Sequence, residues 1–213
     1  MPRRKFECDS TVPYHLCARS NNRDWFALPT SAVWRVLCDY LYLIHMVFGV
    51  KIHSFVLMNN HFHLVASFPE ANLSAAMNYF LRETSRVIGY ESDRINHVYG
   101  TRIFRSRIGS FHHFQNIYKY VYRNPVKAGI YEKVEDYEFS TLHSLLGRST
   151  LPLPVVDDTL LFDAGTEQIM DWLNRPTDEE AWESIRKGLM RREFKLPPVK
   201  SSRRENPLES QLL

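Results

Sequence analysis

Glycine and cysteine are both scarce in this chain, at 8 and 3 of its 213 residues. The low glycine count, with 44% hydrophobic and 24% charged residues, argues against collagen-like, low-complexity and wholly disordered proteins. The three cysteines have no Cys-x-x-Cys spacing, which argues against a disulfide framework and against a thiolate zinc site. We therefore predict a reduced, cytoplasmic protein.

Long hydrophobic runs are also missing. The longest, near residues 41–50, is interrupted by His45 and is too short to span a bilayer. The basic amino terminus is not followed by the apolar stretch that signal peptides carry. The sequence thus predicts neither a membrane-crossing segment nor a secretory signal.

The formal net charge is only +3, but it is distributed unevenly along the chain. Residues 1–81 carry a net +2, residues 82–127 a net +6, residues 128–183 a net −10 and residues 184–213 a net +5. A basic block that also contains many aromatic residues is typical of a surface that follows a phosphate backbone. Because cations also form ordinary solvated faces, charge alone indicates a nucleic-acid partner without establishing it.

Hydrophobic periodicity predicts an α+β fold. The predicted strands cover residues 14–19, 51–58, 61–68 and 99–112, and the predicted helices cover residues 30–48, 71–90 and 115–123. A tight turn at Asn59-Asn60 joins the second and third strands as a hairpin. This order approximates a ferredoxin-like sandwich, in which helices pack on one face of a central antiparallel sheet.

Changes in composition divide the chain into three parts. Residues 1–148 form the predicted α+β domain. Residues 149–196 begin with a proline-containing linker and continue as an acidic extension with two short helices, and residues 197–213 read as a flexible basic tail. The acidic segment over residues 128–183 has three open roles: competing with DNA for the basic surface, binding a partner, or packing on the core.

The tripeptide His61-Phe62-His63 is the most informative short motif. On a strand, residues two apart project from the same face, so both imidazoles share one face while Phe62 and Leu64 point to the core. Two nitrogen donors on a rigid strand suit a divalent metal. The pair alone is not specific, and a third ligand has to come from an Asp, Glu, His, Asn or Gln elsewhere.

Three tyrosines lie close together in the last predicted helix. At about 100° per residue, Tyr120 and Asn124 lie on one side of the helix, while Tyr118 and Tyr122 lie on nearly the opposite side, where core packing explains them. Tyr120 is flanked by Arg123, and neighbouring positive charge favours the phenolate that a tyrosine nucleophile needs. Asn124 is either a ligand at this site or only the N-cap of a following turn.

Four segments in order resemble the single-tyrosine HUH transposases, most closely the REP-associated tyrosine transposases of bacteria. They are Val12-Pro13-Tyr14-His15-Leu16 with Arg19 and Arg23, residues 56–65 around the histidine pair, Ile103-Phe104-Arg105-Ser106-Arg107, and residues 120–129. The resemblance covers about residues 11–141. Four motifs with this order and spacing are far more specific than the histidine pair alone.

The resemblance implies a metal-dependent single-strand DNA endonuclease and strand transferase that nicks at or near a DNA hairpin. It implies that His61 and His63 bind Mg²⁺ or Mn²⁺, that Asn124 is the third protein ligand, and that Tyr120 attacks the DNA. The product would be a 5′-phosphotyrosine and a free 3′ hydroxyl. The protein would then be a bacterial, nucleoid-associated monomer or homodimer.

The predicted DNA contacts are basic residues in the motifs and in the +6 block. They are Arg19, Arg23, Arg102, Arg105, Arg107, Lys119, Arg123 and Lys127. Unpaired bases would stack on Phe104, Phe111 or Phe114 beside them.

Two other functions fit the same residues. A DNA- or RNA-binding regulator keeps the fold and the basic surface without cutting, whereas a hydrolytic metallonuclease cuts without needing Tyr120. A covalent DNA adduct that is lost in Tyr120→Phe separates the transposase-like enzyme from both.

Overall fold

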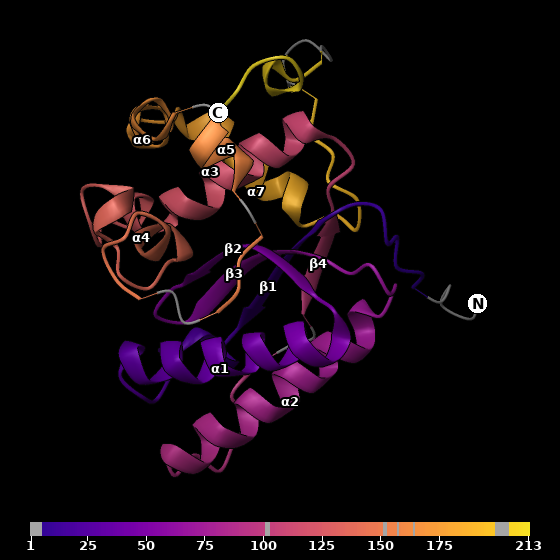
Figure 1. Cartoon of the computed structure of the whole chain (residues 1–213), viewed down its shortest axis with the longest axis vertical. Helices are drawn as coiled ribbons and strands as arrows, with labels where there is room; N and C mark the ends of the chain where they lie inside the picture. Colours follow the sequence, from indigo (N-terminus) through magenta and orange to yellow (C-terminus); the bar gives the residue numbers. More distant parts are fainter. Residues whose placement is uncertain (1–5, 101–102, 151–152, 157, 164, 199–204) are drawn as a thin grey trace.

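The computed structural model describes residues 6–100, 103–150, 153–156, 158–163, 165–198 and 205–213. At its centre is an antiparallel four-stranded sheet in the order β2-β3-β1-β4 (Figure 1). The strands are β1 (Tyr14–Arg19), β2 (Lys51–Leu57), β3 (His61–Ser67) and β4 (Phe104–Arg107). Helix α1 (Thr30–Phe48) connects β1 to β2, and α2 (Leu73–Glu91) connects β3 to β4. This β-α-β-β-α-β order confirms the predicted ferredoxin-like sandwich.

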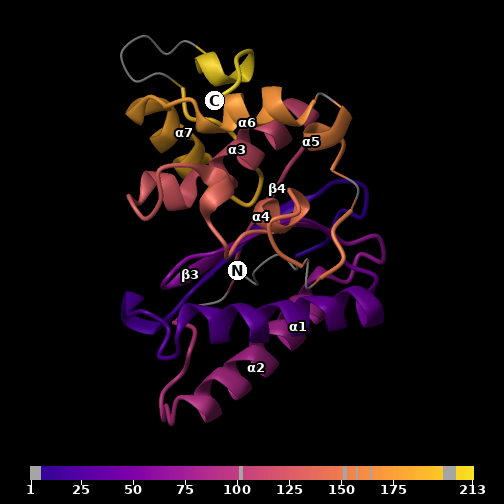
Figure 2. The same ribbon diagram turned by 60° about the vertical axis from the view of Figure 1, so that its left-hand side comes forward.

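Helices cover both faces of the sheet, whereas the sequence predicted helices on one face only. Helices α1 and α2 lie on one side, and α3 (Phe111–Lys127) lies on the other with the C-terminal helices (Figures 1 and 2). The alternation of β3 explains the two layers, because Phe62 and Leu64 belong to the core beneath α1 and α2 while Val65 belongs to the core beneath α3. A sheet that is apolar on both faces is covered on both.

Helix α1 is long and apolar enough to cross a membrane by length and composition alone. In the structure its fully buried side chains, including Val33, Leu37, Leu41 and Ile44, pack in the core with the sheet and α2. Gly49 ends the helix with a φ of 65°, a left-handed conformation that glycine adopts without steric cost. Core packing thus accounts for the buried side of α1, whereas Leu43, Met46 and Val47 near its end are exposed.

Helix α3 is longer at both ends than the predicted helix over residues 115–123. It begins after Ser110, whose hydroxyl accepts a hydrogen bond from the His113 amide, and it continues past Pro125 to Lys127. Pro125 cannot donate to the Val121 carbonyl one turn earlier. The side-chain amide of Asn124 lies near that carbonyl and donates to the carbonyls of Tyr120 and Val121, at 2.7 and 3.5 Å. Asn124 is therefore not the N-cap of a separate turn.

The acidic extension shares a hydrophobic core with α3. It contains the two predicted helices, α6 (Thr166–Asn174) and α7 (Glu179–Leu189), and a five-residue helix α5 (Thr159–Asp163) that the sequence analysis missed. Their buried side chains, such as Leu161, Leu173 and Ile185, lie in the same cluster as Ile117 and Val121 of α3. Before them, a short helix α4 (Thr141–Leu145) packs near β2.

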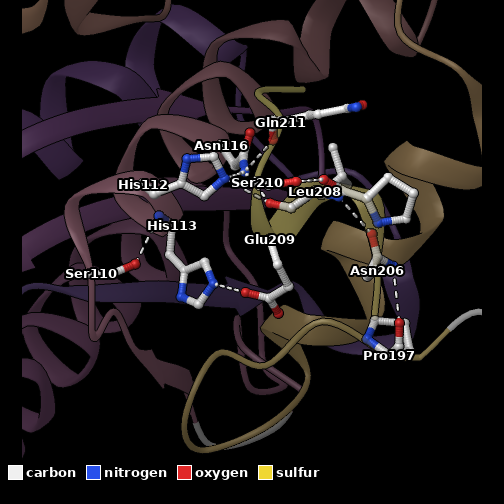
Figure 3. Close-up of polar contacts among 11 residues, drawn as sticks. Ser110, His112, His113, Asn116, Pro197, Asn206, Leu208, Glu209, Ser210 and Gln211 are labelled. Carbon is white, nitrogen blue, oxygen red and sulfur yellow. Dashed lines mark hydrogen bonds and ion pairs between the residues drawn. The ribbon is translucent and has the colours of Figure 1, made fainter. Parts of the chain in front are cut away.

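The end of the chain packs against α3, although the sequence predicted a flexible tail over residues 197–213. Residues 206–213 lie beside the start of α3 (Figure 3). Asn116 is fully buried there. Both of its side-chain polar groups have partners, because it donates to the Leu208 carbonyl at 3.2 Å and accepts from the Leu213 amide at 2.6 Å. Leu208 and Leu213 are buried in the same cluster, which explains why this polar-looking segment packs on α3; residues 199–204 of the predicted tail lie outside the described residues.

Candidate active site

The histidine pair lies in the middle of the sheet, on the face covered by α3. Strand β3 pairs with β1 so that His61 is opposite Arg19 and His63 is opposite Cys17. The two imidazole rings are 4.9 Å apart, centroid to centroid, and nearly perpendicular. The predicted side-by-side arrangement of His61 and His63 is thus present.

Hydrogen bonds orient both imidazoles. The Asn60 amide donates to the Arg23 carbonyl at 2.8 Å, so its oxygen faces Nδ1 of His61 at 2.7 Å. Because an amide oxygen only accepts, Nδ1 of His61 carries the proton and Nε2 keeps its lone pair. Nδ1 of His63 is 2.8 Å from Nε2 of His15, while Nε2 of His63 is buried and has no hydrogen-bond partner among the residues that the structure describes. Nε2 is therefore the ring nitrogen of His63 that is left for another ligand.

All three imidazoles are held neutral by burial. Loss of solvation, with the nearby charge of His61 as a second cause, lowers the pKa of His15 to about 3. Loss of solvation, followed by the charge of Arg19, lowers the pKa of His61 to about 4. The pKa of His63 is also lowered, mainly by burial and then by the neighbouring imidazoles and Arg19. A neutral imidazole is the form that binds a metal.

Tyr120 of α3 lies against the histidine pair. Its ring is 5.7 Å from the His63 ring, centroid to centroid, in an edge-to-face arrangement. Its other neighbour is Trp182 of α7, with ring centroids 4.4 Å apart. The side chain is only 5% exposed. Tyr118 and Tyr122 are buried on the other side of α3, as the helix geometry predicted.

Burial raises the pKa of the Tyr120 hydroxyl, and the nearby thiol of Cys17 adds to the rise. The positive charge of Arg186 lowers this pKa, the carboxylate of Glu183 raises it, and the positive charge of Arg19 lowers it. Arg123, which the sequence predicted as the flanking cation, instead donates to the Leu173 carbonyl at 2.8 Å. The cations that favour the phenolate thus come from α7 and β1.

A cavity of about 730 Å³ joins these groups. Its volume lies within the range of about 300–1,000 Å³ that small-molecule sites occupy. The lining residues are His15, Cys17, Arg19, Ser20, Asn21, Asn22, Arg23, Met58, His61, His63, Gly100, Phe104, Tyr120, Asn124, Lys127, Ala128, Trp182, Arg186, Leu189 and Met190. All four residues that the sequence predicted for chemistry therefore face one space: His61, His63, Tyr120 and Asn124.

The donors around this cavity fit a divalent metal. His61 and His63 each have an Nε2 available, and Asn124 uses its amide nitrogen within α3, which leaves the oxygen as its ligand atom. The Cys17 thiol is not a comparable donor, because burial raises its pKa to about 11. Across the described part of the chain, no three His, Cys, Asp or Glu side chains are grouped as a metal site. The donor set is thus two imidazoles and one amide.

The predicted DNA-contacting cations fall into two groups. Arg19, Arg23 and Lys127 line the cavity. Lys127 also forms an ion pair with Glu179 of α7. Arg102 lies outside the described residues.

The remaining four cations are placed elsewhere. Lys119 and Arg123 are buried beneath α6, where the Lys119 amine lies 5.3 Å from the Trp172 ring centroid. Burial, followed by the charges of Arg123 and Arg175, lowers the pKa of Lys119 to about 8. Arg105 lies over the Phe6 ring, with its Cζ 3.7 Å from the ring centroid.

Arg107 forms ion pairs with Asp9 and Glu193, at 2.9 and 3.0 Å. Because Lys119 and Arg123 are buried beneath α6, the prediction that they contact DNA is wrong for this structure.

The predicted base-stacking residues are also divided. Phe104 is half exposed and lines the cavity, beside Cys17 in the β1–β4 register. Phe111 and Phe114 stack on each other at the other end of α3, where they line a separate cavity of about 420 Å³. Only Phe104 is placed to meet a base at the histidine pair.

Among the lining residues without a predicted role, three contact the site groups or add charge to the cavity: His15, Trp182 and Arg186. His15 shares its strand face with Cys17 and Arg19, but its contact with His63 depends on the β1–β3 register. Trp182 and Arg186 are four residues apart on α7, a spacing that places both on one side of a helix. That spacing was visible in the sequence, but the direction in which this side faces was not.

Comparisons with known proteins found matches among transposases. Residues 8–124 match the profile of the family described as "Transposase IS200 like". The chain is 25% identical over 135 residues to the REP-associated tyrosine transposase of Escherichia coli (strain K12), an alignment that covers 60% of this chain and 79% of that protein. A solved structure of a REP-associated tyrosine transposase bound to a REP hairpin has a TM-score of 0.59 and 20% identity.

That structural alignment covers 75% of this chain and 94% of the other, and it shows a shared fold. The family profile covers more than half of the chain and includes β1, the histidine pair, Tyr120 and Asn124. The resemblance found in the sequence motifs is thereby confirmed. The chain belongs to the IS200-like transposase family.

Proposed function

We propose that this protein is a metal-dependent DNA nicking and strand-transfer enzyme that uses Tyr120 as its nucleophile. The observation that carries the proposal is the meeting of His61, His63 and Tyr120 in one cavity, although the tyrosine comes from a separate helix. A purely structural role does not explain a buried Nε2 without a partner in His63, directly beside the Tyr120 ring.

The proposed step is an exchange of one phosphoester for another. The Tyr120 hydroxyl oxygen attacks the phosphorus, and the bond from phosphorus to the 3′ oxygen breaks. The phenol loses its proton and the departing 3′ oxygen gains one, so the products are a 5′-phosphotyrosine and a free 3′ hydroxyl. No nucleoside triphosphate is needed, because the number of phosphoester bonds is unchanged. Attack by another 3′ hydroxyl reverses the step and joins strands.

The chain's own groups prepare this reaction in three ways. Asn60 and His15 hold the imidazoles so that both Nε2 atoms are available. Trp182 and the α3 core fix the Tyr120 ring and exclude water from it. Arg19 and Arg186 supply the positive charge that counteracts the burial of the phenol.

Two imidazoles and an amide oxygen suit Mg²⁺ or Mn²⁺, with Mn²⁺ at least as well matched to nitrogen donors. His61, His63 and Asn124 would hold the ion. When bound, it would draw negative charge from a non-bridging phosphate oxygen.

The proposed substrate is single-stranded DNA at the foot of a hairpin. One tyrosine acts on one strand, and Phe104 is exposed beside the histidines, where an unstacked base can lie on it. Arg19, Arg23 and Lys127 line the same cavity and are placed to meet phosphates. The REP hairpin bound to the structurally similar transposase supports a DNA hairpin as the ligand here.

The decisive experiment incubates the protein with Mn²⁺ and a labelled DNA hairpin that carries single-stranded flanks, followed by denaturing electrophoresis. The wild-type protein should give a covalent protein–DNA band, and Tyr120→Phe should give none. Tyr118→Phe is the matched control, because Tyr118 is a buried tyrosine of the same helix with its hydroxyl bonded to Asp158 at 2.6 Å. It should keep the covalent band.

Two other outcomes would indicate a different function. Hairpin binding without a band in the wild-type protein indicates a binding regulator. Cleavage that persists in Tyr120→Phe indicates a hydrolytic metallonuclease.

A further inference from the structure

Helix α7 forms one wall of the cavity that contains Tyr120, although it lies beyond the residues matched by the family profile. Trp182 packs on the Tyr120 ring, and Glu179 pairs with Lys127 at the end of α3. The Lys127 amine is also 6.0 Å from the Trp182 ring centroid. These contacts fix α7 against the helix that carries the tyrosine.

Arg186 is the cation that α7 brings to this cavity. It follows Trp182 by one helical turn and lines the cavity with Leu189 and Met190. Its side chain is 51% exposed, so a ligand in the cavity can reach it. It is also close enough to Tyr120 for the two groups to interact electrostatically.

Glu183 fixes the orientation of Arg186. One carboxylate oxygen accepts from Nε and the other from Nη2, both at 2.6 Å. This two-point contact holds the plane of the guanidinium and uses two of its five N–H donors. A guanidinium held in this way keeps donors for a second anion, and phosphate oxygens match its geometry.

We propose that Arg186 binds a non-bridging oxygen of the phosphate that Tyr120 attacks, so that the C-terminal extension completes the active site. This inference rests on the proposed function, since it assigns a group to the same reaction. Negative charge on the phosphate oxygens is redistributed as the phosphorus is attacked. A fixed donor beside these oxygens stabilises that charge in the transition state. Arg186 therefore affects the rate of adduct formation as well as binding.

The test compares Arg186→Gln with Lys187→Gln. Lys187 is the matched control, because it neighbours Arg186, contacts the same Glu183 at 3.4 Å and belongs to the same helix. Both variants remove one positive charge, but Arg186→Gln removes the two-point contact to Glu183 and Lys187→Gln removes a single, longer one. The rate of covalent adduct formation is measured in a single turnover, with protein in excess and saturating over a labelled hairpin, so that weaker binding does not limit it.

We expect Arg186→Gln to slow adduct formation about 10- to 100-fold, the effect of losing one charge-assisted hydrogen bond. Lys187→Gln should stay within about twofold of the wild-type rate. Arg186→Lys should recover part of the loss, since it restores the charge without the fork. Equal thermal unfolding midpoints for the two glutamine variants show that the fold is intact.

Three results would overturn the inference. The first is an Arg186→Gln rate equal to that of Lys187→Gln. The second is a faster rate in Arg186→Gln, which would mean that α7 hinders access of DNA to the cavity. The third is a slower rate that comes with a lowered unfolding midpoint and is not relieved by Arg186→Lys. Failure of the proposed function looks different, because then the wild-type protein itself forms no adduct or Tyr120→Phe still forms one.

Discussion

Replacing His15 tests how the histidine pair is prepared for a metal. His15 is 3% exposed and its Nε2 is 2.8 Å from Nδ1 of His63. His15→Leu keeps a buried side chain but removes this hydrogen-bond partner. Outer groups that orient a metal-binding histidine contribute about 10- to 100-fold to metal affinity, which is about 1.4–2.8 kcal/mol. We therefore expect Mn²⁺ to bind about 10- to 100-fold more weakly to His15→Leu.

The assay is titration with Mn²⁺, followed by calorimetry or by electron paramagnetic resonance of the free ion. His53→Leu is the control, because His53 is also a partly buried imidazole of this sheet, bonded to Ser67 at 2.7 Å, but it lines the other cavity. It should leave Mn²⁺ affinity unchanged. His15→Gln, which retains a hydrogen-bonding group, should recover part of the affinity.

In the protein without metal, nitrogen NMR should find the His63 proton on Nδ1. Wild-type Mn²⁺ affinity in His15→Leu, alongside lost binding in His63→Ala, would refute the orienting role.

Three further predictions concern stability and binding. Because burial lowers the pKa of His15 to about 3, below its unfolded value of 6.5, the unfolded chain takes up the proton first as the pH falls. Between pH 6.5 and 5, the free energy of unfolding from urea titrations should therefore fall by about 2 kcal/mol more in the wild-type protein than in His15→Leu; an equal fall in both contradicts this. Asn116→Ala removes the bond to the Leu208 carbonyl shown in Figure 3 and the bond from the Leu213 amide. The loss of about 2 kcal/mol should lower the unfolding midpoint by about 4–8 °C, and an unchanged midpoint would show that the tail docks without Asn116. Hairpin affinity should fall about 10- to 40-fold between 50 and 200 mM salt if the cavity cations meet two or three phosphates, and a change below twofold removes those contacts.

Much of the sheet and its chemistry could be predicted because strand and helix periods are local. Alternation places His61 and His63 on one face and Phe62 on the other, and the structure agrees. Helical spacing likewise separates Tyr120 from Tyr118. The end of α1 at Gly49 depends only on a local backbone conformation.

What could not be predicted depends on partners far away in the chain. Lys119 and Arg123 look like surface cations, but α6 covers them with Trp172 and the Leu173 carbonyl. A cation's burial is decided by the element that packs over it, which the local sequence does not specify. The His15–His63 contact similarly requires the register of two strands.

The end of α3 was predicted too early because of Pro125. Pro125 is a helix breaker by local rules, yet the helix continues because the Asn124 side chain donates to the carbonyls of the preceding turn. The same contact turns the Asn124 amide so that its oxygen is left for another ligand. A single local exception thus sets both the length of the helix and the orientation of a proposed metal ligand.

The most direct test of the account is a crystal structure with Mn²⁺, in which anomalous scattering locates the ion. We predict one strong peak at bonding distance, about 2 Å, from Nε2 of both His61 and His63, on the side of the cavity that Tyr120 faces. A protein that forms the covalent adduct with Mn²⁺ but places the ion away from both imidazoles would contradict the account.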